Sequence, residues 1–156
     1  MTYRVREATI DDLDVLVHHR IAMFTDMGLD FDAPALAAAF APWLRAMMPA
    51  GTYRAWLAVA EDGSISGGAG ATILPWPPGP TYPGDTLAFV YNVYTEPSHR
   101  RQGIAVLLMD ALHAWCSANG VTSIALNASR DGQPLYESLG YQLSPSPMMF
   151  FSLVGV

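Results

Sequence analysis

The chain has 156 residues, enough for one domain with a sizeable core, and 51% of them are apolar, which argues against disorder. Its net charge of −6 disfavours non-specific binding to nucleic acid or to anionic lipid. No apolar run approaches the roughly 18 residues that span a bilayer, and the first residues lack the apolar stretch of a secretory signal. We therefore expect a cytoplasmic protein that binds neither membranes nor nucleic acid.

Residue types that the chain lacks exclude several kinds of chemistry. Its eight basic residues are all arginine, so there is no Schiff-base lysine and no P-loop lysine. Cys116 is the only cysteine, which excludes intrachain disulfides and cysteine-rich zinc sites and favours a structural thiol. The four histidines do not have the spacing of metal ligands, so we expect no metal. Adjacent His18 and His19 point to different sides of a helix and are expected at the surface, with one of them facing a substrate cleft as the alternative.

Local signals bound the first strand and the first helix. Residues 3–8 predict a short strand. Thr9 followed by Asp12 resembles a capping box, and apolar residues then recur at helical spacing. We expect a helix that runs to about Met27 and ends at Gly28.

A second helix is predicted after Asp32, which can cap it, with Pro34 in the first turn. Pro42 should kink or split this helix because proline has no N–H group to donate. Its apolar face consists of Leu36, Phe40, Trp43, Leu44 and Met47. We favour core packing for these side chains over the alternative, the wall of a substrate pocket.

Residues 53–60 and 64–74 predict two strands joined at Asp62-Gly63, a strong hairpin signal. The glycines at positions 67, 68 and 70 weaken the second strand or mark a bulge. Residues 75–84 hold five of the twelve prolines and cannot form regular structure. This loop is either part of a substrate mouth or an ordinary rigid connection.

The second half of the chain alternates between strands and helices. We predict a strand at 86–95, a helix at 103–119, a buried strand at 121–126, a short helix at 131–139 and closing strands at 141–143 and 148–153. The absence of an internal repeat or a linker predicts one domain, residues 1–156, of the α/β class with a mixed sheet.

An anion site is predicted where the strand at 86–95 gives way to the next helix. Arg100 and Arg101, preceded by His99, are the only local concentration of positive charge. Gly103 and Ala105 let a ligand approach the backbone, and the first N–H groups of a helix attract anions. The pattern predicts a diphosphate site, with small residues placed for helix packing as the alternative.

The same segment resembles the signature Gln/Arg-x-x-Gly-x-Gly/Ala of the GNAT family of N-acetyltransferases, with Arg100, Gly103 and Ala105 in its fixed places. Residues 126–141 resemble the family's later motif, which ends in Leu-Tyr-Glu-x-Leu-Gly-aromatic. Both blocks lie in the family's order and spacing, and the resemblance is strongest over residues 86–143.

The resemblance implies a GNAT-like fold, with a central, mostly antiparallel sheet of six to seven strands. The sheet would splay between its fourth and fifth strands and be flanked by about four helices. The family uses acetyl-CoA or another acyl-CoA as cosubstrate, and its acceptors include amines of small molecules and of peptides. Dimers are frequent in the family, so a homodimer is consistent with the resemblance.

The resemblance also implies a cofactor site. Its residues would be Val93, Tyr94, Thr95, Arg100, Arg101, Gln102, Gly103, Ile104, Ala105, Asn127 and Ser129. Backbone N–H groups of residues 101–105 would hold the pyrophosphate, and residues 93–95 would pair with pantetheine like an extra strand. In this family an N–H group near Val93 polarises the thioester carbonyl, which is stabilisation by a fixed dipole.

Tyr136 is the candidate general acid, because its place in the later motif would let its hydroxyl group protonate the leaving thiolate. The alternative is a purely packing role. The general base is less clear, since Phe89 stands where many relatives carry a glutamate. Asp85, Asn92 and Glu96 are nearby candidates.

The sequence does not determine the acceptor. Specificity in the family comes from the first two helices and the loops over the cleft, here about residues 24–50 and 75–85. The acidic stretch at 26–32 could attract a cationic amine such as a polyamine or an aminoglycoside, but helix-terminal and surface acids explain it equally well. Two rival functions stay open: an acyl-CoA-binding module without catalysis, and a generic nucleotide-binding domain.

Overall fold

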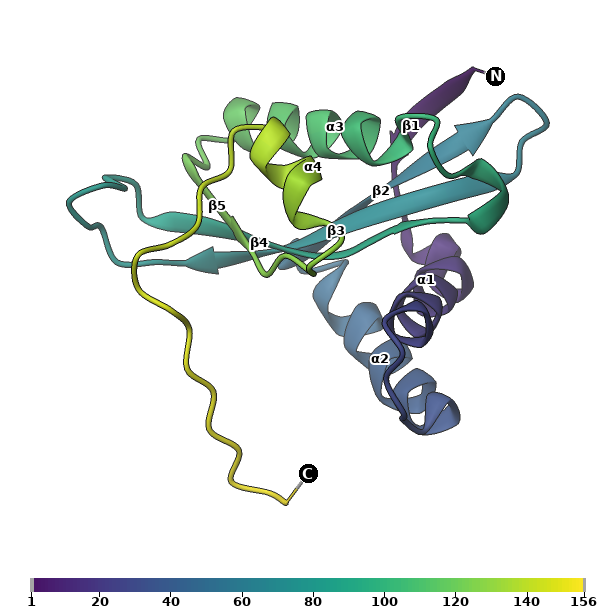
Figure 1. Ribbon diagram of the computed structural model, residues 1–156, viewed down its shortest axis with the longest axis horizontal. Coiled ribbons are helices and arrows are strands. Elements are labelled where there is room, and N and C mark those ends of the chain that lie inside the picture. The colour runs from purple at the N-terminus through teal and green to yellow at the C-terminus, as the bar shows by residue number, and fades with distance from the viewer. Residues whose placement is uncertain (1, 156) are drawn as a thin grey trace.

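One mixed sheet runs through the molecule (Figure 1). The computed structural model describes residues 2–155. The strands are β1 (Tyr3–Glu7), β2 (Tyr53–Ala60), β3 (Ile65–Pro75), β4 (Thr86–Thr95) and β5 (Ser123–Leu126), in this order across the sheet. Neighbouring strands are antiparallel from β1 to β4, and β4 is parallel to β5. The described residues thus form five strands rather than the six to seven expected.

Helices cover both faces of this sheet (Figure 1). One face carries α1 (Leu13–Asp26) and α2 (Ala33–Met47), and the other carries α3 (Ile104–Ala118) and α4 (Gln133–Ser138). A short 3-10 turn at Ile10–Asp12 precedes α1. Another at Pro97–His99 precedes the loop that leads into α3. The layered arrangement confirms the predicted fold class.

Each face of the sheet has its own apolar core. The side chains that α3 buries against the sheet are Ile104, Leu108, Met109, Leu112 and Cys116. On the other face, Leu16, Phe40 and Leu44 pack against Tyr53 and Leu57. Burial raises the pKa of the Cys116 thiol to about 11, as expected for a structural cysteine.

Both predicted caps of the first two helices are present. The N–H group of Thr9 donates to Asp12 Oδ2 (2.8 Å), and Thr9 Oγ1 accepts from the N–H group of Asp11 (3.3 Å). The Oδ1 atom of Asp32 accepts from the N–H group of Ala35 (2.9 Å). These bonds satisfy N–H groups that have no intrahelical partner, which fixes where the helices begin.

The second helix is continuous through Pro42, so the expectation of a split at this residue is wrong. Pro42 and Ala38, whose carbonyl group would have accepted the missing bond, are both exposed, so water can replace that bond. Phe40 and Leu44, on either side of the proline, are buried and hold both halves of the helix to the sheet.

The strand β4 contains a one-residue bulge. Gly70 of β3 pairs with Tyr91, whereas Gly68 pairs with Tyr94, so β4 has one residue more than β3 between these pairs. Asn92 lies in the bulge with a φ of 58°, in the left-handed region that asparagine tolerates better than most residues. A second register shift leaves Ser66 as an extra residue of β3, since Ala58 pairs with Gly67 and Val59 with Ile65, so the bulge that the glycines predicted in this strand is present beside Gly67.

The pairing of β4 with β5 is short. Residues 87–90 of β4 pair with residues 123–126 of β5, and β4 then continues to Thr95 without β5 beside it. This divergence confirms the expected splay between the fourth and fifth strands. It opens a space at the carboxyl end of the parallel pair.

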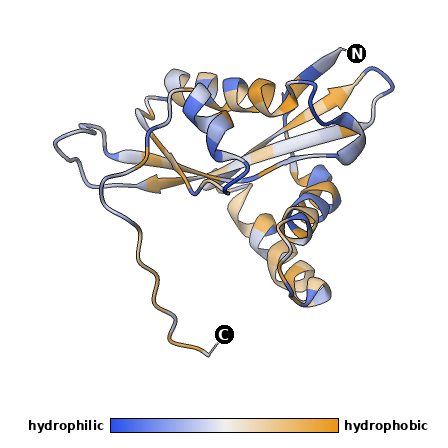
Figure 2. Cartoon of the chain, viewed as in Figure 1, coloured by the Kyte–Doolittle hydropathy of each residue, from blue (hydrophilic) through white to orange (hydrophobic). Residues whose placement is uncertain are grey.

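The closing strands predicted at 141–143 and 148–153 are not formed. Pro145 and Pro147 lie between the two predicted strands, and both segments stay unpaired although neither contains a proline. The chain instead leaves the body of the protein, and Figures 1 and 2 show a largely apolar tail lying away from the sheet. Met149 in this tail is 93% exposed.

Alanine in place of Gly70 should destabilise the fold. An added Cβ would lie 1.9 Å from Oη of Tyr53, a side chain that is itself buried and cannot move aside. We expect Gly70→Ala to lower the free energy of unfolding by about 1–3 kcal/mol, measured by urea denaturation. Gly155→Ala, where a Cβ meets no neighbour, is the control, and equal stability of the two variants would contradict the argument.

Candidate active site

A cavity of about 570 Å³ opens where β4 leaves β5. Its wall brings together α1, β4, the loop after β5 and α4. Seven of the predicted site residues line it: Val93, Tyr94, Thr95, Arg100, Asn127, Ser129 and Tyr136. The other predicted residues, at positions 101–105, form the turn and helix start that follow Arg100 and do not line the cavity.

The end of β4 exposes one edge to this cavity. Tyr94 and Thr95 pair with Gly68 and Gly67 of β3 on one side. On the other side, no strand of residues 2–155 pairs with β4 beyond Val90. Apart from the Thr95 carbonyl oxygen, which accepts from Arg100 Nε, the backbone N–H and C=O groups on that edge are therefore open to a ligand that adds as a strand.

The turn at residues 100–106 presents a series of free backbone N–H groups. Within residues 2–155, none of the N–H groups from 101 to 106 has an acceptor, and the first one bonded is that of Leu107, to the Gly103 carbonyl oxygen (3.1 Å). Arg101 and Gly103 have φ values of 62° and 78°, and the buried side chain of Ile104 anchors the helix start. Left-handed residues before a helix form concave sets of N–H donors that bind anions.

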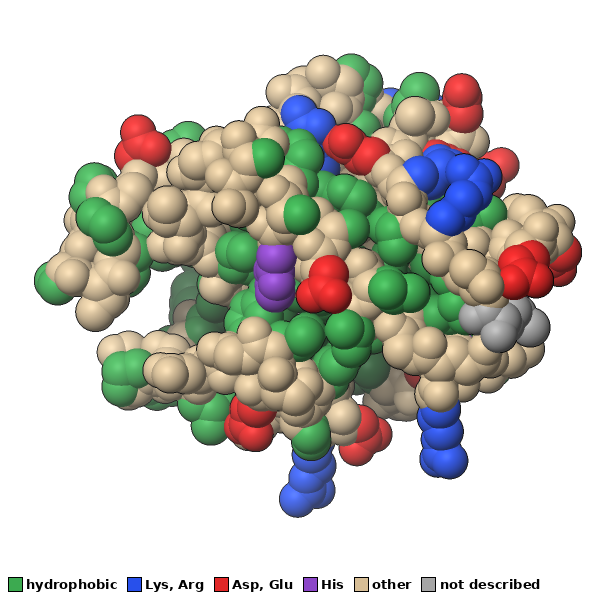
Figure 3. All heavy atoms as spheres, turned by 90° about the horizontal axis from the view of Figure 1, so that it is seen from above, with side chains coloured by type: hydrophobic (Ala, Val, Ile, Leu, Met, Phe, Trp, Pro, Cys, Tyr) green, Lys and Arg blue, Asp and Glu red, His purple; other side chains and the backbone are tan. Residues whose placement is uncertain are grey.

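Side-chain contacts hold the 100–106 turn in place. Arg100 forms an ion pair with Asp26 at the end of α1, and its Nε donates to the Thr95 carbonyl oxygen (3.0 Å). Gln102 Oε1 accepts from the hydroxyl group of Tyr3 (2.8 Å). Because Asp26 neutralises Arg100, the turn attracts anions through its backbone N–H groups and through Arg101, with which no acidic side chain of residues 2–155 forms an ion pair. On the face seen in Figure 3, acidic side chains likewise lie close to basic ones.

The helix α4 places Tyr136 at the cavity wall. Ser129 Oγ accepts from the N–H group of Gly132 (3.1 Å), which ties the loop after β5 to the start of α4. The Tyr136 ring packs edge-on against Tyr141, and its hydroxyl group makes no hydrogen bond to another residue in the described part of the chain. Burial raises the pKa of Tyr136, so this hydroxyl group keeps its proton at neutral pH and is free to donate it.

A chain of polar side chains crosses the α1–α2 face of the sheet. Arg20 Nη1 donates to Asn92 Oδ1 (2.7 Å), and Asn92 Nδ2 donates to Tyr53 Oη (2.7 Å). The guanidinium group of Arg20 lies 5.0 Å from the ring centres of both Phe24 and Phe40. Burial raises the pKa of Tyr53 to about 12, so its hydroxyl group stays neutral. The bulge at Asn92 is thus fixed from α1 and β2.

The profile of the Acetyltransferase (GNAT) family matches residues 18–141. This chain belongs to the GNAT family. Its structure is similar to a GCN5-related N-acetyltransferase from Ralstonia eutropha JMP134, with 34% identity, coverage of 96% of this chain and 99% of that one, and a TM-score of 0.84. It is also similar to a predicted acetyltransferase with acetyl-CoA from Clostridium acetobutylicum, with 25% identity, coverage of 96% of both chains and a TM-score of 0.83.

An aminoglycoside N(6')-acetyltransferase type 1 from Klebsiella aerogenes is 39% identical over 69 residues. This match covers 44% of each chain, less than half the length of that relative. The family profile and the two structures similar over nearly their whole length place the chain among the GNAT acetyltransferases. No helix within residues 2–155 is long and apolar enough to cross a membrane.

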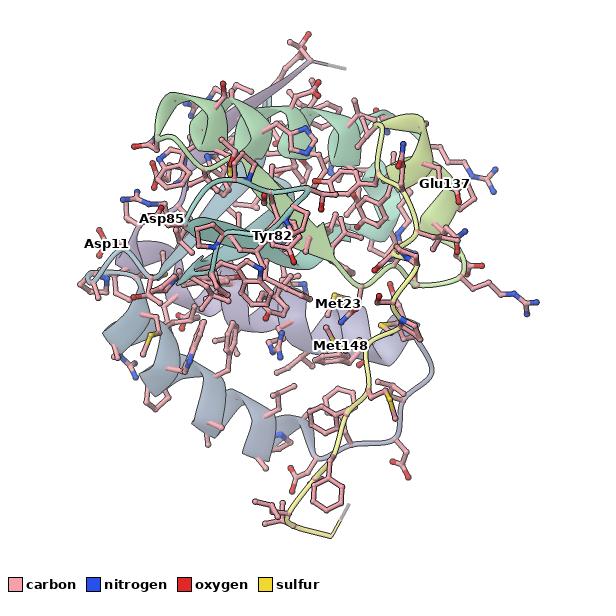
Figure 4. All side chains as sticks on the ribbon, turned by 90° about the vertical axis from the view of Figure 1, so that its left-hand side faces the viewer. Asp11, Met23, Tyr82, Asp85, Glu137 and Met148 are labelled. Carbon is pink, nitrogen blue, oxygen red and sulfur yellow. The ribbon has the colours of Figure 1, made fainter. Side chains whose placement is uncertain are left out.

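Of the three candidate bases of this acetyltransferase, only Asn92 lines the cavity. Glu96 instead lies 2.7 Å from His18 Nε2. Asp85 lies in the loop before β4, and Figure 4 shows it well apart from Met23 of the cavity wall. Because an amide does not accept a proton at neutral pH, Asn92 is better suited to orienting a substrate than to deprotonating one.

Sequence analysis placed the end of α1, from residue 24, among the segments over the cleft, but it did not single out Arg20 or Met23 as lining residues. The cavity is lined by four residues of α1 and the one just after it: Arg20, Met23, Phe24, Asp26 and Met27. Most of them recur at the three- and four-residue spacing that places side chains on one helix face. That spacing was visible in the sequence, but it indicated a core face and gave no sign that this face borders a cavity.

His19 is buried rather than at the surface as expected, and 1% of it is exposed. Neither ring nitrogen has a hydrogen-bond partner among the described residues, and the nearest carboxylate oxygen, Glu96 Oε1, is 3.6 Å from Nε2. Gly68 makes room for the ring, since a Cβ there would lie 2.8 Å from Nδ1. Desolvation lowers the pKa of His19 to about 4, despite the opposing effect of Glu96.

This burial predicts a loss of stability in mild acid. The pKa of His19 is lower in the folded than in the unfolded chain. The free energy of unfolding should therefore have its full value above about pH 6.5 and should decrease as pH falls towards 4. The loss attributable to this group should be roughly 3 kcal/mol. Urea denaturation at pH 7 and pH 4.5 should show a smaller loss for His19→Leu than for the wild type. His18→Leu is the control, and parallel losses in all three proteins would contradict the assignment.

Proposed function

We propose that this acetyltransferase moves the acetyl group of acetyl-CoA onto a primary amine of a small molecule or a peptide, by direct attack of the amine on the thioester. The observation that carries the proposal is the meeting of three features at one cavity and at the turn that directly follows Arg100 of its wall. They are the free edge of β4, the free N–H groups of the 100–106 turn and the unbonded hydroxyl group of Tyr136.

Backbone groups would supply most of the contacts to the cosubstrate. The N–H groups of residues 101–105 are free to bind its pyrophosphate, and the open edge at residues 93–95 is free to pair with its pantetheine arm. Asn127 and Ser129 would contact it from the wall formed by the loop after β5. The N–H group at Val93 would polarise the thioester carbonyl.

The proposed reaction forms a bond between the amine nitrogen and the carbonyl carbon, and it breaks the bond between that carbon and sulfur. Tyr136 donates its hydroxyl proton to the departing thiolate. The attacking nitrogen loses its own proton to water at the mouth of the cavity. The neutral, half-buried state of Tyr136 supports this role, because an ionised hydroxyl could not donate.

Replacing Tyr136 by phenylalanine should lower turnover far more than it raises the KM for acetyl-CoA. The ring and its packing stay, and only the proton donor is lost, so kcat should fall about 100-fold or more. Steady-state assays of thiol release measure both constants. Tyr141→Phe removes the hydroxyl group of the neighbouring ring as a control, and an unchanged kcat for Tyr136→Phe would remove Tyr136 from the acid role.

Gly103→Glu should abolish the binding of coenzyme A while leaving the protein folded. A Cβ at this position meets no atom within 4 Å apart from its chain neighbours, but the glutamate would place a negative charge beside the free N–H groups. Thermal-shift titration with coenzyme A measures the loss. Gly103→Asn is the matched control, because asparagine tolerates the φ of 78° and adds no charge. Stabilisation of Gly103→Glu equal to that of the wild type would argue against a phosphate site here.

Thiol release also separates catalysis from mere binding. An enzyme should release free coenzyme A from acetyl-CoA only when an acceptor amine is added. If acetyl-CoA binds but no amine of a broad panel promotes this release, the chain acts as an acyl-CoA-binding module instead. Equal affinity for ATP and coenzyme A by calorimetry would favour a generic nucleotide-binding domain.

A further inference from the structure

A second cavity, of about 460 Å³, adjoins the first. It lies between α2 and the strands β2, β3 and β4. Arg20, Tyr91 and Asn92 line both cavities, so the two spaces meet at these side chains. A small molecule in the second cavity would therefore border the part of β4 where the thioester is proposed to lie.

The second cavity has an apolar and aromatic wall. Phe40 and Trp43 of α2 stack with ring centres 5.8 Å apart, and Trp43 packs edge-on against Tyr53 at 5.1 Å. Leu36 and Leu74 add aliphatic surface. Such a wall favours an acceptor with an apolar or aromatic body.

Arg20 is the only charged residue in this wall, and no carboxylate lines it. One of its N–H groups donates to Asn92, and no acidic side chain in residues 2–155 forms an ion pair with it. Burial lowers the pKa of Arg20, which shows that its charge is held in a partly desolvated position. A guanidinium group carries five N–H donors in a planar fork, so those not used by Asn92 are available to a ligand.

Packing fixes this cation in position. Its guanidinium group lies over the rings of Phe24 and Phe40, and its bond to Asn92 ties it to the bulge of β4. A pre-oriented, unpaired guanidinium group in an aromatic cavity is a receptor for a planar anion, and it repels ammonium groups.

We infer that the acceptor is an amine that also carries a carboxylate and an apolar or aromatic body, in the manner of an apolar amino acid, and that Arg20 binds the carboxylate. This inference rests on the proposed acyl transfer. Because Arg20 lines both cavities, an amine one carbon away from its carboxylate can face the first cavity while the apolar body fills the second.

The same geometry disfavours a polycationic acceptor such as an aminoglycoside. Two carboxylates line the first cavity: Asp26, which is already paired with Arg100, and Asp131 in the loop before α4, and neither of them lines the second cavity. In the second cavity, the ammonium groups of a polycation would find no acidic partner. They would instead meet the positive charge of Arg20. Acidic composition near the end of α1 therefore does not make the acceptor cavity acidic.

Matched pairs of amines test the inference on the wild-type protein. L-Phenylalanine is compared with phenethylamine, and L-leucine with isopentylamine, so that each pair differs only in the carboxylate. Kanamycin and spermidine represent polycations. With saturating acetyl-CoA, we expect kcat/KM from thiol release to be about ten-fold or more higher for the carboxylate member of a pair, as a charge-assisted hydrogen bond predicts.

Variants test whether Arg20 is the cause. Arg20→Met should bring the ratio of kcat/KM within each pair close to one, and Arg20→Lys should keep part of the preference. Arg45→Met removes the same charge from an exposed position on α2 and should leave the ratio unchanged. Because the ratio compares two substrates of one protein sample, partial unfolding of a variant does not alter it.

Calorimetry on the complex with coenzyme A separates this inference from the proposed function. If the carboxylate members bind preferentially but no amine releases thiol, the acyl transfer fails and the carboxylate site stands. If thiol is released with the decarboxylated amines, spermidine or kanamycin at least as well as with the amino acids, the inference is overturned and acyl transfer stands. Failure of the amino acids both to bind and to react would also overturn it.

Discussion

The divergence of β4 from β5 is the constraint on which the site depends. Parallel pairing stops at residues 90 and 126, so the last part of β4 keeps backbone groups that face a cavity instead of a neighbouring strand. Unpaired backbone groups are tolerated where solvent or a ligand can reach them. The short pairing therefore creates both the cavity and the polar strand edge at which we propose that the cosubstrate binds. The turn before α3 continues the same row of free donors.

Asn92 connects this cosubstrate side to the acceptor side. Its left-handed backbone forms the bulge, while its side chain is held between Arg20 and Tyr53 on the opposite face. Gly70 leaves the space that the Tyr53 hydroxyl group occupies. The backbone geometry at the proposed reaction centre and the charge in the acceptor cavity are consequently parts of one packed unit. A substitution that alters the bulge is therefore expected to shift Arg20, and a substitution of Arg20 is expected to alter the bulge.

Local charge and net charge differ in sign in this protein. The chain carries a net charge of −6, yet the only charged residue lining the second cavity is Arg20. Arg100, which was predicted from sequence to attract phosphate, is neutralised by Asp26, whereas Arg20, which no acidic residue in the described part of the chain pairs with, was not singled out from sequence. The net charge limits how strongly the protein attracts a charged ligand from a distance. Which ligand a cavity binds depends instead on the charges that folding leaves there without a partner.

The sequence by itself determined the family, both helix caps, the hairpin, the bulge region and most of the chain segments that border the cavity, because each of these depends on residues only a few positions apart. It did not determine the continuity of α2 at Pro42, the fate of the apolar tail or the burial of His19, because exposure and available strand edges are properties of the folded chain. Arg20 and Asn92 are 72 positions apart, and only tertiary packing of α1 on β4 joins them. The proposed cosubstrate side could therefore be predicted from a local motif. The proposed acceptor side could not, because its side chains are distant in sequence and come together only in the folded chain.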